Sequence, residues 1–218
     1  QAIRNKKDLN QFPATNKFRS EGEYPKYHKI GRVPKPTDFI GGNHENNLWH
    51  SQYPSGHELI RNLHYLGRSG VKSFDDIKIG WISGTYSEPT FEGTKEKPKY
   101  HHFTKKDFYN LEENMNDLDI LISHDWPSIR EMNKHILKSS VSNDSTLEIA
   151  LKINLGSKEL YKLVEELKPK YVFSGHLHMP LSFNMNFDNK RTRFIGLNEL
   201  EGKDSIYVMN SSEVRKPL

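Results

Sequence analysis

The chain alternates short apolar runs with polar stretches rich in proline and glycine, and the apolar runs predict the strands of the fold. Runs of about four to eight residues that are continuously apolar or alternate with period two are typical of strands. A turn at FDD (74–76) is predicted to separate the strands expected at 62–67 and 77–84. The expected strands are TDFIGG (37–42), NLHYLG (62–67), IKIGWISG (77–84), LDILISH (118–124), YVFSGHLH (171–178), LSFNMNF (181–187), TRFIGL (192–197) and SIYVM (205–209).

Other segments carry apolar residues at helical spacing. A threonine directly before 105–116 can cap a helix there, and a proline directly after 157–168 stops a second helix. A third helix is expected over 128–138, whereas 143–154 fits either a helix or a strand. Strand–helix–strand units followed by a series of strands favour a layered α/β sandwich.

Proline, glycine and charged residues mark the irregular parts of the chain. Four prolines fall within 1–36, which predicts loops and short helical turns, and 85–103 has no apolar period and predicts a long loop of the kind that is often functional. We expect one domain over 1–200 and the start of a C-terminal region or tail over 201–218.

Composition favours a globular protein with long polar loops. The chain has 218 residues, of which 34% are hydrophobic, and a mean hydropathy of −0.82. Its aromatic content argues against disorder. The net charge of +4 permits an anionic partner but is small for a strongly basic nucleic-acid module. Without cysteine there is no disulfide framework, and no apolar run approaches the ~18 residues that cross a membrane, so we expect no membrane association.

Three of the predicted strands end in polar side chains that suit metal chemistry. Ligands of open α/β sheets usually lie beyond the carboxyl ends of the strands, so these side chains are expected on one rim. Imidazole nitrogens and amide oxygens suit Mn, Fe or Zn, and the lack of thiolates favours a catalytic rather than a structural site. The rim residues are Asn43, His44, His124, His176 and His178.

The histidine pair and the remaining histidines leave alternatives open. In a strand, His176 and His178 would share a face, whereas in a turn they can reach two different metals. The other histidines singled out are expected to be solvated or packed; they are His28, His50, His57, His64 and His135.

The strand-end motifs GGNHE, SHDWP and SGHLH, in this order, resemble the calcineurin-like metallophosphoesterases, whose signatures include GNH followed by an acidic residue and GHxH. The fuller strings TDFIGGNHE, LDILISHDWP, LGSKELYKLVEELKPKYVFSGHLH, HYLGRSGV, IGWISGTY and TRFIGL are similar to the RNA lariat debranching family. The similarity covers about residues 1–197.

The resemblance implies a centre of two divalent metal ions, Fe, Zn or Mn. Asn43, His124 and His176 would hold one ion and His178 the other, while His44 would act on the leaving-group oxygen. Glu45 is expected to be a loop-anchoring carboxylate or a partner of a ligand. The implied reaction is hydrolysis of the 2′,5′-phosphodiester of branched lariat RNA by a nuclear monomer, with shuttling to the cytoplasm left open.

The resemblance also implies residues that this chain does not contain. Family members begin with a strand that ends in Cys-x-His or Asp-x-His and continue to Gly-Asp, whereas this chain begins at QAIR. We therefore expect an N-terminally truncated chain that lacks the first strand, a bridging aspartate and the first two ligands, and that as such binds metal poorly and is inactive.

The basic aromatic stretch KEKPKYHHFTKK (95–106) has two interpretations. Its basic residues, among them Lys99, with the interleaved Tyr100, His101, His102 and Phe103 can bind phosphate and stack on splayed bases, or the stretch is a solvated loop. It departs from the Tyr-His-x-Arg pattern of the family. In SHDWP, Trp126 and Pro127 are expected to shape the turn, and Asp125 either orients a histidine or is solvated.

Two alternatives to lariat debranching stay open. The first is another calcineurin-like phosphoesterase that acts on a phosphoprotein or a nucleotide. The second is a non-catalytic RNA-binding relative, against which the presence of all five rim residues argues.

Overall fold

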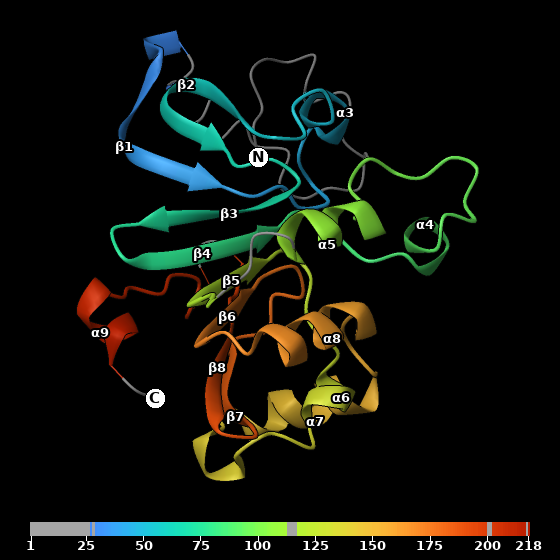
Figure 1. Cartoon of the computed structure of the whole chain (residues 1–218), viewed down its shortest axis with the longest axis vertical. Helices are drawn as coiled ribbons and strands as arrows, with labels where there is room; N and C mark the ends of the chain where they lie inside the picture. Colours follow the sequence, from blue (N-terminus) through green and yellow to red (C-terminus); the bar gives the residue numbers. More distant parts are fainter. Residues whose placement is uncertain (1–26, 28, 113–116, 200–201, 217) are drawn as a thin grey trace.

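A six-stranded mixed sheet forms the centre of the molecule, with strand order β3-β4-β5-β6-β8-β7 (Figure 1). The structure is a computed structural model that describes residues 27, 29–112, 117–199, 202–216 and 218. The four inner strands run parallel, and the two edge strands pair antiparallel with their neighbours. The strands are β3 (Ser69–Phe74), β4 (Ile77–Ile82), β5 (Ile120–Ser123), β6 (Tyr171–Ser174), β7 (Leu181–Phe187) and β8 (Lys190–Gly196).

A second, two-stranded parallel sheet lies beside β3 and consists of β1 (Arg32–Phe39) and β2 (His57–Tyr65) (Figure 1). Its register shifts between Arg32 and Thr37, where Pro34 and Pro36 lie within the strand. Because proline cannot donate a hydrogen bond to a neighbouring strand, it is tolerated in a strand mainly at edges and bulges. The two prolines therefore coincide with the register shift. β1 begins at Arg32, before the predicted run at 37.

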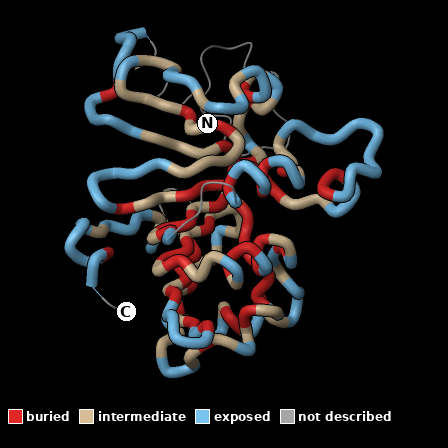
Figure 2. The backbone as a smooth tube through the Cα atoms, in the orientation of Figure 1, coloured by how far each residue is buried: buried red, intermediate tan, exposed pale blue. Residues whose placement is uncertain are grey.

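Helices cover one face of the six-stranded sheet. Alternate strand residues such as Leu121, Val172 and Phe194 are fully buried against them, and the buried segments concentrate on this side of the sheet (Figure 2). The helices with residues in this core are α4 (Glu88–Phe91), α5 (Lys105–Glu112), α6 (Ile129–Met132), α7 (Asp144–Lys152) and α8 (Lys158–Leu167). The described chain also has α3 (Asn47–His50), which packs on β1 and β2, the 3₁₀ turn η1 (Lys138–Ser140) and α9 (Ser211–Arg215). Each helix in the described part of the chain falls short of the length and apolarity that crossing a membrane requires.

The other face of the sheet carries Ile79, Ile122 and Phe173, which stay partly exposed. Val214 of α9 packs on this face (Figure 1). The mixed α/β prediction is confirmed, and the arrangement is compatible with an α/β sandwich.

Local signals explain the helix α8. The Ser157 hydroxyl accepts a hydrogen bond from the Leu160 amide at 3.2 Å, which caps the first turn. Lys168 ends the helix in the left-handed conformation, with φ of 46°, directly before Pro169. The predicted boundaries of this helix are therefore confirmed.

Several predicted elements differ from the structure. SIYVM (205–209) is not a strand, and Ile206 and Val208 are 74% and 86% exposed. The helix expected over 128–138 is only the short α6 followed by turns, and the ambiguous 143–154 contains α7. The strand β3 was not predicted, because its sequence SGVKSF has few apolar residues. Residues 1–26 and 113–116 lie outside the described residues.

Candidate active site

Two of the predicted metal-binding segments follow β5 and β6, which are parallel neighbours, so His124 and His176 leave the sheet at the same edge. The third segment follows β1. It is joined to this edge because the Gly84 amide, just after β4, donates to the Gly41 carbonyl at 2.7 Å. The predicted rim is thus formed at the carboxyl ends of these strands.

The side chains of Asn43 and His124 meet directly. The Asn43 Oδ1 and His124 Nε2 atoms are 3.0 Å apart, and the rings of His124 and His176 have centroids 4.9 Å apart. Two ligands of one ion, each about 2.1 Å from it, are about 3.0 Å apart at right angles and about 3.4 Å apart at the tetrahedral angle. The Asn43–His124 separation is that of a hydrogen bond, and it also fits two ligands at right angles around one ion.

The approach of His124 to Asn43 requires a glycine at position 42. A Cβ atom built on Gly42 would lie 2.4 Å from the His124 ring, which is closer than real side chains approach. The Gly42 amide donates to the Glu45 carboxylate at 2.6 Å. Glu45 thus anchors the turn that carries Asn43 and His44. This agrees with the expectation of a loop-anchoring carboxylate.

His176 and His178 lie in a turn rather than in a strand. β6 ends at Ser174, and both histidines adopt the left-handed conformation, with φ of 63° and 54°. Between them the Leu177 amide donates to the Gly175 carbonyl at 2.7 Å. Left-handed backbone costs a residue with a side chain about 1–3 kcal/mol and clusters at functional sites. The turn allows the two rings to serve different positions, which the spacing alone left open.

Glu199 is a residue of this edge that the sequence interpretation missed. Its Oε2 atom lies 3.6 Å from Nδ1 of His178. A carboxylate on one ring nitrogen is the usual partner of a metal-binding histidine, because it leaves the other nitrogen for the metal. The signal was present, since Glu199 follows the end of β8 just as the histidines follow β5 and β6.

Burial keeps His124 uncharged. Desolvation, followed by the neighbouring His176 and His44, lowers the pKa of His124 to about 3. Burial also lowers the pKa of His176, and the Asp125 carboxylate opposes that shift. A neutral imidazole presents a lone pair, which is the form that a metal ion requires.

Buried hydrogen bonds hold the SHDWP turn (123–127) in place. The Asp125 carboxylate is buried, not solvated, and accepts hydrogen bonds from the amides of Tyr86 at 2.8 Å and Trp126 at 2.9 Å. The Trp126 indole is fully buried and donates to the Gly175 carbonyl at 2.6 Å. Trp126 thus ties the turn after β5 to the turn after β6, which confirms its predicted role in shaping the site.

The residues predicted to bind substrate differ in how far they are exposed to solvent. Lys99 and Tyr100 are exposed, and His101 is half-buried with a pKa that burial and then His102 lower to about 4. Phe103 is fully buried in the core, so it cannot stack on RNA bases as the basic aromatic stretch suggested. His44 is exposed beside the rim.

Of the remaining histidines, two have packed roles. His50 is 1% exposed and contacts Tyr65, with ring centroids 4.4 Å apart, and His135 lies 3.1 Å from the Tyr161 hydroxyl. His57 stacks on Tyr53 at the surface. These agree with the expectation of packed or solvated residues, while His28 lies outside the described residues.

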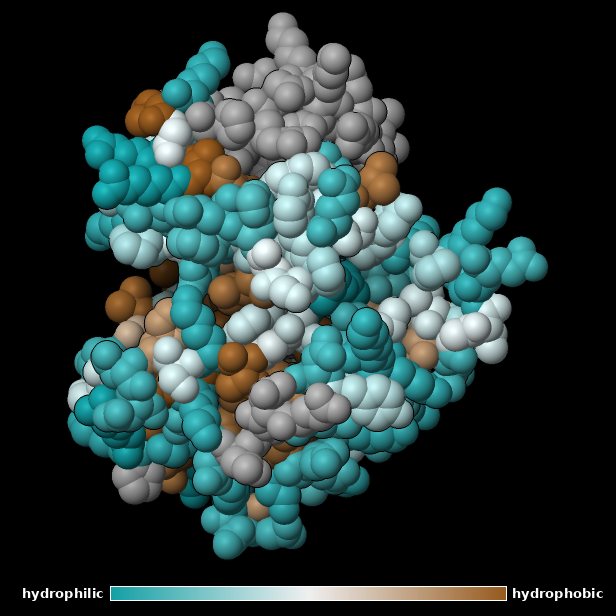
Figure 3. Space-filling model, turned by 45° about the horizontal axis from the view of Figure 1, so that its top comes forward, coloured by the Kyte–Doolittle hydropathy of each residue, from teal (hydrophilic) through white to brown (hydrophobic). Residues whose placement is uncertain are grey.

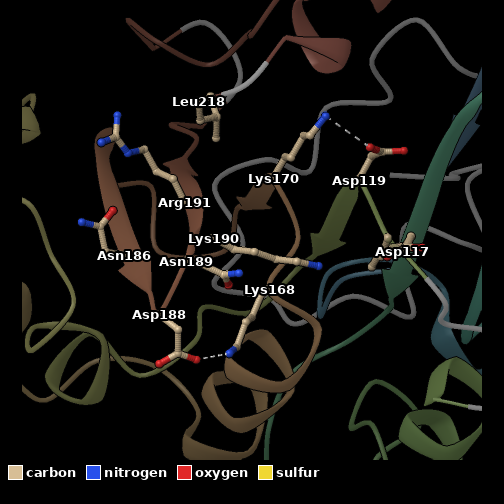
Figure 4. Close-up of a pocket in the computed structure, with 11 residues that line it drawn as sticks. Asp117, Asp119, Lys168, Lys170, Asn186, Asp188, Asn189, Lys190, Arg191 and Leu218 are labelled. Atoms are coloured by element: carbon tan, nitrogen blue, oxygen red, sulfur yellow. Dashed lines mark hydrogen bonds and ion pairs between the residues drawn. The ribbon is translucent and has the colours of Figure 1, made fainter.

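A hollow of about 460 Å³ lies at the opposite end of the sheet, near the starts of β5, β6 and β8 (Figure 4). Its charges are largely paired: Lys168 binds Asp188, and Lys170 lies 3.8 Å from Asp119. No histidine lines this hollow. The molecular face in Figure 3 is mostly hydrophilic, with small apolar patches. The strand-end rim, not this hollow, therefore has the chemistry of a metal site.

The rim fits part of a metal centre. Within the described ranges, no group of three or more His, Cys, Asp or Glu side chains has the arrangement of a complete metal site. The amide oxygen of Asn43 and the ring nitrogen of His124 nevertheless have the spacing of co-ligands. Asn43 and His124 would therefore be only some of the ligands of an ion at this rim, and others would have to complete its coordination.

Comparison with curated proteins finds lariat debranching enzymes. The enzyme of Arabidopsis thaliana is 36% identical over 228 residues, which cover 96% of this chain and 53% of that protein. The Homo sapiens enzyme is 31% identical, covering 96% of this chain and 42% of that protein. The Schizosaccharomyces pombe enzyme is 32% identical, with shares of 82% and 41%. The chain thus spans about half the length of these relatives or less, and no family model matches it.

We expect Gly42→Ala to destabilise the protein by about 1–3 kcal/mol, because the new methyl group would displace the His124 ring. Gly175→Ala is the matched control, since a Cβ there meets only the His124 carbonyl, at 3.9 Å. Urea denaturation measures both free energies of unfolding. Equal stability of the two variants would show that the His124 ring does not occupy this position.

We expect the free energy of unfolding to fall as the pH is lowered from about 6.5 towards 4. His124 and His101 have lowered pKa values, about 3 and about 4, so the unfolded chain takes up protons that the folded chain does not. His124→Gln should make this fall shallower, which urea denaturation at a series of pH values measures. An unchanged slope in the variant would contradict a buried neutral His124.

Proposed function

The chain is a relative of the lariat debranching enzymes along nearly its whole length, and on that ground we propose that it forms part of a metal-dependent phosphodiesterase acting on the 2′,5′-linkage of branched RNA. The observation that supports this most directly is the 3.0 Å approach of Asn43 Oδ1 to His124 Nε2 at the strand-end rim. Hydrolysis of a phosphodiester by two metal ions is a chemistry for which such oxygen and nitrogen donors are suited.

In this proposal the rim residues have distinct roles. Asn43, His124 and His176 hold one divalent ion, Fe, Zn or Mn, and His178 holds a second. When bound, such ions lower the pKa of a bound water and neutralise charge on the phosphodiester. The Oε2 atom of Glu199 lies 3.6 Å from Nδ1 of His178. In this proposal the contact shortens to a hydrogen bond when the ion binds, so that the other ring nitrogen of His178 is left for the ion.

His44 is proposed as the general acid. It lies one residue beyond Asn43 and is exposed at the rim, so its ring can reach a phosphodiester that the neighbouring residues hold. A proton delivered from His44 to the departing ribose oxygen would prevent the build-up of an alkoxide. General acid catalysis of this kind contributes about 10²- to 10⁴-fold.

The exposed Lys99 and Tyr100, with half-buried His101, are proposed to contact the RNA around the branch. A lysine supplies charge to a phosphate, and an aromatic ring supplies a face on which an unpaired base stacks. We further propose that residues 1–200 belong to the metallophosphoesterase domain, that 201–218 begin a C-terminal region, and that the protein acts as a nuclear monomer.

The test is hydrolysis of a synthetic 2′,5′-branched RNA compared with a linear 3′,5′ RNA of the same sequence. We expect the full protein that contains this chain to cleave the branched RNA only, in the presence of Mn²⁺, and to lose activity when a chelator removes the metal. Equal cleavage of both RNAs would favour a phosphoesterase of broader specificity. Binding of RNA without metal binding or cleavage would favour a non-catalytic relative.

We expect His44→Ala in the same protein to lower turnover by about 10²- to 10⁴-fold, because the proton donor is lost, while the metal content stays unchanged. His57→Ala is the control, since His57 stacks on Tyr53 at the surface. Turnover and elemental analysis of the purified variants provide the two readouts. Loss of metal in His44→Ala would make His44 a ligand instead.

A further inference from the structure

The segment that carries the proposed RNA-binding residues is held by its backbone. On one side, the Thr85 amide donates to the His101 carbonyl at 2.8 Å, and the Phe103 amide donates to the Thr85 carbonyl at 3.1 Å. Gly84 has φ of +94°, and a Cβ there would lie 2.1 Å from the His101 carbonyl oxygen. The loop is therefore fitted closely against the end of β4.

On the other side, one arginine reaches three acceptors. Arg68 donates from Nη1 to the Tyr100 carbonyl at 3.0 Å, and from Nη2 to the His102 carbonyl at 2.7 Å and to the Asp107 carboxylate at 3.0 Å. The side chains of Arg68 and Asp107 are only 14% and 9% exposed. The guanidinium thus binds the backbone on both sides of His101.

The position of Arg68 is itself fixed. Its amide donates to the Pro54 carbonyl at 2.8 Å, and its carbonyl accepts from the Ser83 amide at 2.8 Å. Asp107 also accepts from the amide and hydroxyl of Thr104, at 2.8 and 3.1 Å, at the start of α5. Arg68 therefore joins the 99–102 segment to the residue that follows β4, to Pro54 and to the start of α5.

The same elements hold the metal-binding turn. The Ser83 hydroxyl accepts from the Gly41 amide at 3.0 Å, and the Gly84 amide donates to the Gly41 carbonyl at 2.7 Å. Residues 83–85 are thus bonded to the turn before Asn43 on one side and to the loop at His101 on the other. A loop held in this way keeps a set distance from the rim.

We propose that Arg68 is a positioning residue, which sets the 99–102 segment relative to the Asn43–His124 rim so that Lys99, Tyr100 and His101 meet the RNA at the branch. The inference rests on the proposed function. Arginine suits the task because its planar fork binds several acceptors at once, whereas a lysine ammonium is a compact point charge that cannot reproduce the fork.

Arg68→Lys tests the proposal, with Arg61→Lys, an exposed arginine of β2, as the matched control. We expect Arg68→Lys to weaken binding of a branched RNA about tenfold, the effect of one lost charged hydrogen bond, with a smaller change for linear RNA. Fluorescence anisotropy measures both affinities. Metal content and the urea midpoint should stay close to those of Arg61→Lys.

Limited trypsin digestion supplies a readout that does not depend on RNA. We expect cleavage after Lys95 and Lys99 to be about tenfold faster in Arg68→Lys, because the segment loses the hydrogen bonds that Arg68 donates to it. If digestion and branched-RNA affinity both match those of Arg61→Lys, Arg68 does not position the loop. Faster digestion with unchanged branched-RNA affinity would also overturn the proposal.

The two proposals fail in different ways. If the parent protein binds branched and linear RNA equally, the proposed branch-specific function is wrong, and the inference about Arg68 falls with it. If the parent prefers branched RNA and Arg68→Lys keeps that preference and affinity, only the role of Arg68 is wrong.

Discussion

The 3.0 Å contact between Asn43 and His124 joins residues 81 positions apart in the chain, and the candidate site depends on it. The contact requires that the turn after β1 reach the turn after β5, although β1 belongs to a separate two-stranded sheet. Two local features allow this. Gly84 bonds to Gly41 across the gap between the sheets, and Gly42 has no side chain to collide with the imidazole.

The same contact determines the electrostatics of the rim. His124 is shielded from water and lies beside His176, and no carboxylate is among the groups that shift its pKa. Its pKa therefore falls and the ring stays neutral. Asp125, the nearest buried carboxylate of that turn, is occupied by two backbone amides. The Asp125 carboxylate thus holds the SHDWP turn and only opposes the lowering of the His176 pKa, in which burial is the larger effect.

Strand ends and the helix at 157–168 could be predicted from the sequence because both depend on local pattern. An apolar run that turns polar gives the rim residues, and apolar residues at helical spacing with a following proline give the helix bounds. The prediction at SIYVM failed because a short apolar run does not say whether a strand finds a partner, and Ile206 and Val208 are exposed. β3 was missed for the converse reason: with Gly70 and three polar residues, it is a strand through pairing with β4.

Long-range pairing also explains which site residues were missed. Glu199 and Arg68 act on residues 21 and 32 or more positions away, and no local period links them. Arg68 differs from the exposed lysines of the loop in a way that composition cannot show. The Arg68 guanidinium is largely buried and donates hydrogen bonds to two carbonyls and a carboxylate. Lys95, Lys97 and Lys99 are exposed to water instead. A rigid backbone with free cationic side chains is the arrangement by which a loop can meet a polyanion without losing its own position.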